Sequence, residues 1–199
     1  MIKVNFEIDD ETQSFNVPEQ WDEVTVGQFM ELVELQNISK EEKNPLNTVM
    51  KMTTILTGIP LDIIEMVPVE QFHLIQDTLK YSKEDVNIDK KESVTIGDEI
   101  FYIKNDFNSL TMGETITIET LVKDAGDNIM SVFDKMLCVF LRKKTKKGNL
   151  ESFKSVFIQD RSEMFRGLSI ESVYAIMIFF SNGVTTSEGT TKTSLETKK

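Results

Sequence analysis

His73 and Cys138 could serve as a general base, a metal ligand or a nucleophile, and each is the only residue of its type in the sequence. A zinc site or a catalytic pair needs further groups of this kind nearby. His73 lies between Phe72 and Leu74 in a helical apolar pattern, and Cys138 lies in an apolar run without a neighbouring charge that would lower its pKa. We therefore expect His73 at a helix surface or boundary and Cys138 as a buried structural thiol.

Two acidic clusters and two glycine-containing segments could bind a cation or a phosphate. Asp9-Asp10-Glu11 and Asp98-Glu99 occupy expected hairpin turns, where Asp is favoured for backbone reasons, and neither has EF-hand spacing. Thr25-Val26-Gly27 and Thr111-Met112-Gly113 contain one glycine each, whereas a phosphate-binding loop needs several. Helix caps explain these segments better. The sequence therefore predicts no catalytic residues, no metal and no cofactor, and it favours a protein that is not an enzyme.

One dense basic run stands out as a candidate partner-binding site. The run from 142 to 148 reads Arg-Lys-Lys-Thr-Lys-Lys-Gly, and we expect it to form an exposed, solvated loop. Two further uses remain open, namely docking on the acidic half of a neighbouring copy and contact with nucleic-acid phosphates. The candidate binding residues are Arg142, Lys143, Lys144, Lys146 and Lys147.

The charge of the chain is unevenly distributed. The net charge is −11; residues 1–86 contain 17 acidic and 6 basic residues, and residues 87–199 contain 16 of each. A nucleic-acid-binding protein neutralises phosphates with Lys and Arg, so this balance does not favour nucleic acid as the partner. It is compatible with a basic protein partner.

A sequence motif that leads from a strand into a helix occurs twice. Residues 21–35 align with residues 107–121, with Thr25 on Thr111 and an apolar residue and a glycine after each threonine. A second block, residues 63–70, aligns with residues 164–171. The offset is 86 residues in the first block and 101 in the second, so we expect about 15 inserted residues around the basic run. Two blocks in the same order favour an internal duplication.

The periodicity predicts an α+β fold of two similar modules, each a β-hairpin followed by a small helical bundle and mainly α overall. Alternating apolar residues predict a hairpin at 2–17, and a glycine turn predicts a second one at 93–103. We call residues 1–86 the first repeat and residues 87–184 the second repeat. A capping threonine precedes each of the helices expected at 26–37 and 112–124. Residues 82–92 are expected to form a linker, and residues 185–199 a flexible polar tail.

Methionines are numerous on the expected apolar helix faces. Most of them should fill the core, but methionine-rich helical surfaces also adapt to partner helices. The longest apolar stretch, Val173 to Phe180, is far shorter than the roughly 20 residues that span a bilayer, so we expect no membrane association. The methionines in question are Met50, Met52, Met130, Met136, Met164 and Met177.

Three segments resemble tailed-bacteriophage proteins from the tail gene region, including tail assembly chaperones. They are Val-Pro-Glu-Gln-Trp-Asp-Glu-Val-Thr-Val-Gly-Gln-Phe at 17–29, Leu-Thr-Gly-Ile-Pro at 56–60, and Arg161-Ser162-Glu163-Met164-Phe165 with the residues that follow it. The resemblance implies a late phage protein of the host cytoplasm that binds other tail or baseplate proteins, such as a helical tape-measure protein. It carries over no functional residue. A stoichiometric virion component, or a nucleic-acid-associated phage protein using residues 142–147, remains an alternative.

Overall fold

The computed structural model describes residues 1–8, 11–39, 44–87, 91–104, 106 and 109–178. Helices predominate in these residues, and two small antiparallel sheets accompany them, which confirms the α+β class. None of the helices in these residues combines the length and the apolar composition that crossing a bilayer requires. The expected tail at 185–199, the acidic turn at 9–10 and Phe107, the counterpart of Trp21, lie outside the described residues.

The first repeat begins with a hairpin whose inner face packs on helices. Val17 and Phe6 are buried, and the rings of Phe6 and Phe15 lie 6.0 Å apart, because alternate residues of a strand point to the same face. Two antiparallel strands make the hairpin and helices follow it: β1 (Ile2–Ile8), β2 (Glu11–Val17), η1 (Trp21–Glu23), α1 (Val26–Ser39), α2 (Pro45–Thr57), α3 (Leu61–Met66), α4 (Val69–Thr78) and η2 (Leu79–Lys83).

Local signals set the ends of these helices. The side chain of Asn44 accepts a hydrogen bond from the N–H of Leu46, and Pro45 occupies the first turn of α2, where a missing N–H costs nothing. Gly58 ends α2 with a φ of +69°, a conformation that glycine adopts without strain. Pro60 and Pro68 are the residues directly before α3 and α4.

The second repeat contains a three-stranded sheet where the sequence predicted a hairpin. Its elements are β3 (Ser93–Ile96), β4 (Glu99–Ile103), α5 (Met112–Ala125), η4 (Ile129–Val132), α6 (Phe133–Phe140), β5 (Leu141–Arg142), α7 (Val156–Arg166) and a helix over residues 170–178. The extra strand β5 pairs with β4, with Leu141 opposite Ile103 and Arg142 opposite Tyr102. Leu141 therefore leaves the helix that its apolar spacing predicted and enters the sheet.

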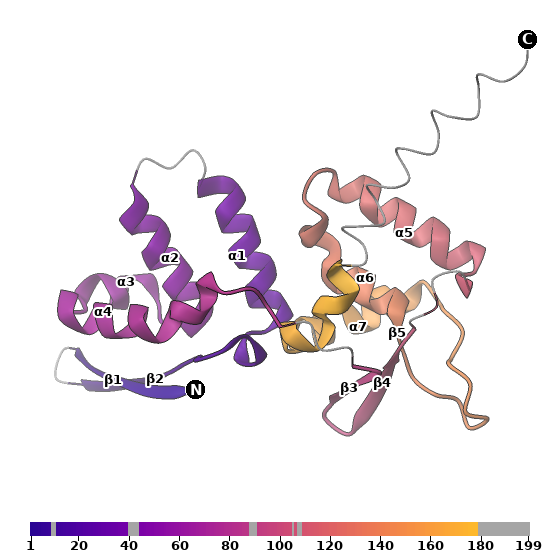
Figure 1. Ribbon diagram of the computed structural model, residues 1–199, viewed down its shortest axis with the longest axis horizontal. Helices are drawn as coiled ribbons and strands as arrows, with labels where there is room; N and C mark the ends of the chain where they lie inside the picture. Colours follow the sequence, from indigo (N-terminus) through magenta and orange to yellow (C-terminus); the bar gives the residue numbers. More distant parts are fainter. Residues whose placement is uncertain (9–10, 40–43, 88–90, 105, 107–108, 179–199) are drawn as a thin grey trace, which may run out of the picture.

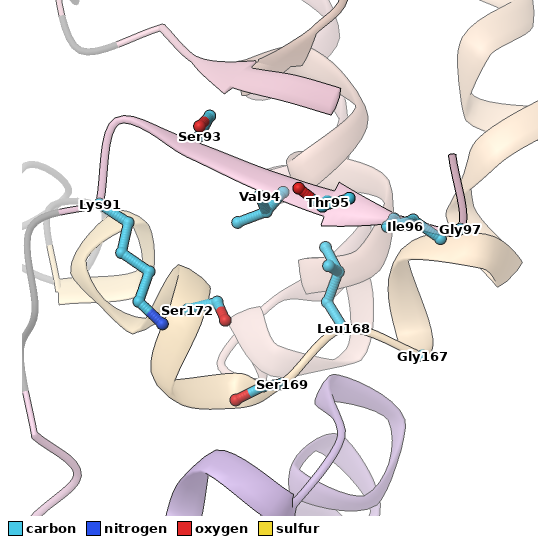
Figure 2. Close-up of a pocket in the computed structure, with 10 residues that line it drawn as sticks. All are labelled: Lys91, Ser93, Val94, Thr95, Ile96, Gly97, Gly167, Leu168, Ser169 and Ser172. Atoms are coloured by element: carbon cyan, nitrogen blue, oxygen red, sulfur yellow. The ribbon is translucent and has the colours of Figure 1, made fainter. Parts of the chain in front are cut away.

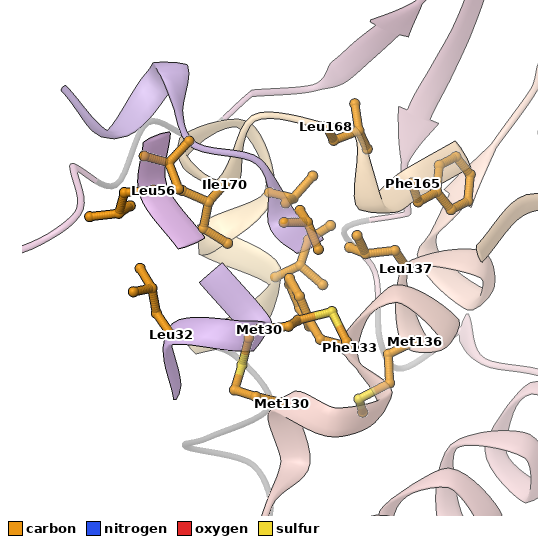
Figure 3. Close-up of a cluster of buried hydrophobic side chains, with 14 of the residues drawn as sticks. Met30, Leu32, Leu56, Met130, Phe133, Met136, Leu137, Phe165, Leu168 and Ile170 are labelled. Carbon is orange, nitrogen blue, oxygen red and sulfur yellow. The ribbon is translucent and has the colours of Figure 1, made fainter. Parts of the chain in front are cut away.

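The two repeats share one core. Figure 1 shows α1 leaning toward α6 and α7, with α3 and α4 at one end of the molecule and α5 at the other. Figure 3 shows Met30 of α1 among Met130, Phe133 and Met136 of the second repeat. Most of the methionines named above are therefore core side chains or pack against the core.

A two-hydrogen-bond β-bridge joins the repeats beside this core. The N–H of Val26 donates to the carbonyl of Leu168 at 2.8 Å, and the N–H of Ile170 donates to the carbonyl of Val24 at 2.8 Å. Thr25 and Ser169 face each other between these bonds. The entry to α1 is thereby fixed on the segment that leads into the last described helix.

Candidate functional site

The basic run does not form the simple loop that the sequence predicted. Lys144 pairs with Leu150 in an antiparallel bridge, and the N–H of Gly148 donates to the carbonyl of Thr145 at 2.9 Å. Gly148 has a φ of +83°, which suits the tight turn. Residues 143–151 therefore form a third, smaller hairpin that continues from β5, and we call it the basic hairpin. Figure 1 shows it as the orange loop that extends from β5 at the lower right of the molecule.

Two of the candidate lysines are engaged within the chain. Lys143 forms an ion pair with Glu99, the residue that begins β4. The ammonium of Lys144 lies 3.7 Å from the centre of the Tyr102 ring, a distance at which a cation and an aromatic face attract each other. Both side chains thus fasten the hairpin to the sheet.

Lys146 and Lys147 occupy the turn of the basic hairpin. Both are exposed, and neither has an ion-pair partner within the described residues. Of the five cations named from the sequence, these two remain available to a partner.

Arg142 is in the core, which corrects the expectation that it lies in an exposed loop. Its side chain is 1% exposed. The guanidinium donates from Nη2 to Glu114 at 3.1 Å, donates from Nη1 to the carbonyl of Cys138, and lies 4.9 Å from the ring centre of Phe153. Arg142 was grouped with the lysines that follow it because it carries the same charge. Its contacts with the buried residues of α6 and β5 make it a structural residue instead.

Glu114 is a buried carboxylate that the sequence analysis did not single out. Burial raises the pKa of Glu114, but hydrogen bonds from Lys104, from Thr111 and from Arg142 outweigh burial and hold that pKa at about 2. The Lys104 ammonium lies 2.8 Å from one carboxylate oxygen and Arg142 binds the other. Glu114 is thus ionised and fully paired, which is the arrangement of a structural residue and not of a general acid.

The same position has an amide in the first repeat. Gln28 and Thr25 form a reciprocal capping box, with hydrogen bonds of 2.9 and 3.1 Å, and Thr111 and Glu114 form another. The Gln28 amide nitrogen also donates to the carbonyls of Ile55 and Leu56, the last turn of α2. A carboxylate cannot donate a hydrogen bond. In the second repeat Arg142 therefore donates both to Glu114 and to the Cys138 carbonyl of α6, and so connects the two helices.

The other chemically reactive residues are isolated from one another. His73 is exposed on α4. Cys138 is buried on α6, where burial and then Asp134 raise the pKa of its thiol to about 12, and the thiol donates to the Asp134 carbonyl at 3.4 Å. Among the described residues, no three His, Cys, Asp or Glu side chains come close enough together to hold a metal ion.

An aromatic pocket of about 330 Å³ lies where the first repeat meets the last described helix. The rings of Trp21 and Phe29 lie 5.6 Å apart, and Phe29 and Tyr174 lie 6.0 Å apart, both in edge-on contact. The exposed residues Lys83, Glu84 and Asp85 line its rim, and the remaining wall is formed by Leu32, Val33, Gln36, Met52, Ser82 and Val86. An apolar interior with a carboxylate rim suits an apolar side chain next to a cation.

The negative charge at the rim affects the pKa of the nearest tyrosine. Burial raises the pKa of Tyr174, and the nearby Asp85 carboxylate raises it further. The indole N–H of Trp21 is already satisfied, because it donates to the carbonyl of Glu84 at 3.0 Å. The pocket therefore offers ring faces and carboxylates to a visitor and no free indole donor.

A second pocket, of about 430 Å³, lies along the outer edge of β3 (Figure 2). Its floor is the segment from Gly167 to Ser169, and Lys91 and Ser172 complete it. Ser169 directly precedes the last described helix, and its hydroxyl has no hydrogen-bond partner in the described residues. Among the described residues, the polar side chains that line the pocket are hydroxyls and a single amine, and none is a carboxylate, an imidazole or a thiol.

Comparison with protein-family models, with curated proteins and with solved structures finds no match to this chain. The aromatic pocket is the site that sequence reasoning missed, because Trp21, Phe29 and Tyr174 come from three separate segments. The signal for Glu114 was present, since it aligns with Gln28 at the 86-residue offset that also aligns the two threonines.

Proposed function

We propose that this protein is a non-enzymatic assembly factor for the tail or baseplate of a bacteriophage, and that it binds other phage tail proteins in the host cytoplasm. The observation that carries the proposal is the aromatic pocket with its carboxylate rim, formed by Trp21, Phe29, Tyr174, Glu84 and Asp85. The resemblance of residues 17–29 and 56–60 to proteins of the tail gene region supports the phage assignment.

The partner that fits this pocket is an amphipathic helix. An apolar anchor of the helix would enter between Trp21 and Tyr174, as helix-in-groove recognition requires. A Lys or Arg one turn away would meet Glu84 and Asp85, and the net charge of the first repeat would steer a basic segment toward them. Holding such helices before assembly requires no catalytic residue.

The experiment is affinity capture from infected host cells with two matched charge variants. Tagged wild-type protein should recover phage tail proteins. The variant Glu84→Lys with Asp85→Lys should lose them, because it reverses the rim charge at exposed positions. The control variant Asp127→Lys with Asp160→Lys makes the same change in charge at exposed positions away from the pocket and should recover them as the wild type does.

Two results would count against the proposal: recovery of no phage protein by the wild type, or equal recovery by the rim variant. Mass spectrometry of purified virions separates an assembly factor from the virion-component alternative. An assembly factor should be absent from mature particles, whereas a structural component should be present in a fixed ratio to the tail proteins.

A further inference from the structure

The N-terminal turn of α1 presents an apolar face that the second repeat covers. Val26, Gly27 and Met30 are all buried there. A methyl group at Gly27 would make ordinary van der Waals contact with the side chain and the carbonyl of Arg166 at 3.4–3.5 Å, so the covering segment packs directly against this turn. The β-bridge to Ser169 continues the same contact through the backbone.

The same face occurs on α5, where the described residues leave it uncovered. At the 86-residue offset, Met112, Gly113 and Ile116 replace the three residues of α1. Met112 is 74% exposed and Ile116 is 55% exposed, and no atom of the described residues lies within 4 Å of a methyl group placed at Gly113. Met112 and Ile116 are thus exposed to solvent, whereas the aligned residues Val26 and Met30 of the first repeat are buried.

The covering segment also occurs twice. Leu168 and Ile170, which cover α1, are buried, and the second aligned block places Val67 and Val69 at their positions. Val69 is 69% exposed, and Met66 beside it is also exposed. Val67 is half-buried and packs against the core of its own chain, so the uncovered apolar surface at the junction between α3 and α4 consists of Met66 and Val69.

The backbone of this junction has the conformation that a bridge requires. Val67 and Pro68 are extended, with ψ angles of 131° and 141°. Pro68 aligns with Ser169, whose N–H takes no part in the bridge, so the proline removes no donor. The N–H of Val69, in the first turn of α4, has no partner in the described residues and can take the place of the Ile170 N–H.

The two uncovered surfaces cannot meet within one chain, because α5 and the α3–α4 junction lie at opposite ends of the molecule (Figure 1). We propose that α5 of one copy binds the α3–α4 junction of a second copy, and that this contact repeats the one between α1 and residues 168–170. The interface is heterologous, so association continues head to tail until a ring closes or a filament forms.

Charge favours this pairing over a symmetric one. In the internal contact Arg166 forms an ion pair with Glu31 at 3.2 Å. Glu65 aligns with Arg166, and Thr117 aligns with Glu31. At the new contact a carboxylate would therefore face a neutral hydroxyl, and no like charges would face each other. Two first repeats placed face to face would instead bring together surfaces that carry the whole net charge of −11.

Sedimentation equilibrium with two surface variants tests the proposal. Wild-type protein should show an average mass that rises above the monomer mass with concentration. Met112→Glu with Ile116→Glu removes the α5 surface, and Val69→Glu removes the junction surface. Each should lower the association constant by about tenfold or more. Ile38→Glu, which changes an equally exposed apolar residue at the far end of α1, should behave as the wild type.

Mixing the two variants provides the decisive measurement. Each retains the surface that the other lacks, so an equimolar mixture should form a dimer of one copy of each and grow no further. Wild-type protein that stays monomeric over the whole concentration series would overturn the proposal. So would a mixture that stays monomeric while the wild type associates, since the two retained surfaces then do not bind each other.

A cysteine pair checks the register. Val67 aligns with Leu168, which faces Val26 across the bridge, so Val67→Cys of one copy should lie opposite Met112→Cys of another. Under mild oxidation, a disulfide-linked dimer should form in the mixture of the two single-cysteine variants and not in either alone. The native Cys138 is buried and does not compete. Crosslinking within either single variant would contradict the head-to-tail register.

Discussion

Glu114 and Arg142 form an ion pair with 3.1 Å between Oε1 and Nη2, and their side chains are only 4% and 1% exposed. The aligned residue of the first repeat, Gln28, achieves the same connection to the following helix with one neutral amide. The second repeat therefore holds a buried ion pair where the first has an uncharged hydrogen bond. Such a pair is sensitive to the loss of either member.

Replacing Arg142 with methionine should destabilise the protein strongly. The variant leaves the Glu114 carboxylate buried with Lys104 as its remaining cation, and breaking a buried pair costs on the order of 3 kcal/mol. The measurement is urea unfolding followed by circular dichroism. Lys147→Met, an exposed cation of the same run, should change the free energy of unfolding by less than about 0.5 kcal/mol.

The double variant Glu114→Gln with Arg142→Met separates charge from packing. It removes both charges and places in the second repeat the amide that the first repeat has. We expect it to be more stable than Arg142→Met alone, because no unpaired carboxylate remains. A double variant that is less stable than the single one would show that Glu114 still stabilises the fold through Lys104 and Thr111 when Arg142 is absent.

Acid should destabilise the protein through Glu114. Its folded-state pKa is about 2, below the ordinary value of 4.5, so its ion pairs stabilise the fold fully above about pH 4.5. This contribution, on the order of 3 kcal/mol, is lost as the pH falls toward about 2. In unfolding measurements across this range, the difference between wild type and Glu114→Gln should shrink toward zero. A constant difference would rule out this origin.

The aligned glycines should both tolerate alanine. Gly113→Ala should stabilise the protein by about 0.5–1 kcal/mol, because alanine is the better helix former and the position is open. Gly27→Ala should stabilise it at least as much, since the new methyl group also makes ordinary van der Waals contact with Arg166 at 3.4–3.5 Å. Thermal unfolding of the two variants side by side measures the difference. A loss of stability in Gly27→Ala would contradict this packing against Arg166.

Local sequence signals were enough to locate most elements of the fold. Alternation predicted the hairpin at 2–17, and a glycine turn predicted the one at 93–103. Proline, glycine and capping residues predicted where α1, α2 and α5 begin or end, because each of these signals acts on its own turn of backbone. The apolar spacing predicted that Leu141 belongs to the preceding helix, and this prediction was wrong because Leu141 forms part of β5. It joins the sheet because β4 offers a free edge, a fact that no local pattern contains.

The pairing between repeats and the aromatic pocket depend on contacts between distant residues. Thr25 meets Ser169, and Phe29 meets Tyr174, across nearly the whole length of the chain. Composition places Arg142 with the lysines that follow it, whereas its burial follows from the sheet and from Glu114. The alignment of residues 21–35 with 107–121 places Met112 on the buried Val26, but only the structure shows that Met112 itself is exposed.

Neutralising the turn of the basic hairpin should leave the fold intact. Lys146→Gln with Lys147→Gln removes two exposed charges that have no ion-pair partner in the described residues, so thermal unfolding should not change. The same variant tests the nucleic-acid alternative by a filter-binding assay at moderate salt. We expect no retention of DNA by either protein. Retention by the wild type that the variant loses would support the alternative.

Trp21 is the only tryptophan and lines the aromatic pocket, so its fluorescence should report on a bound partner. A basic amphipathic helix whose apolar anchor enters beside Trp21 removes water from the indole, and the emission maximum should shift to shorter wavelength. Salt should weaken this binding, since the rim contacts of Glu84 and Asp85 are exposed and screened. An acidic helix of the same apolar pattern is the matched control and should cause no shift. A shift of equal size with both helices would show that burial alone, without the carboxylate rim, governs recognition at this pocket.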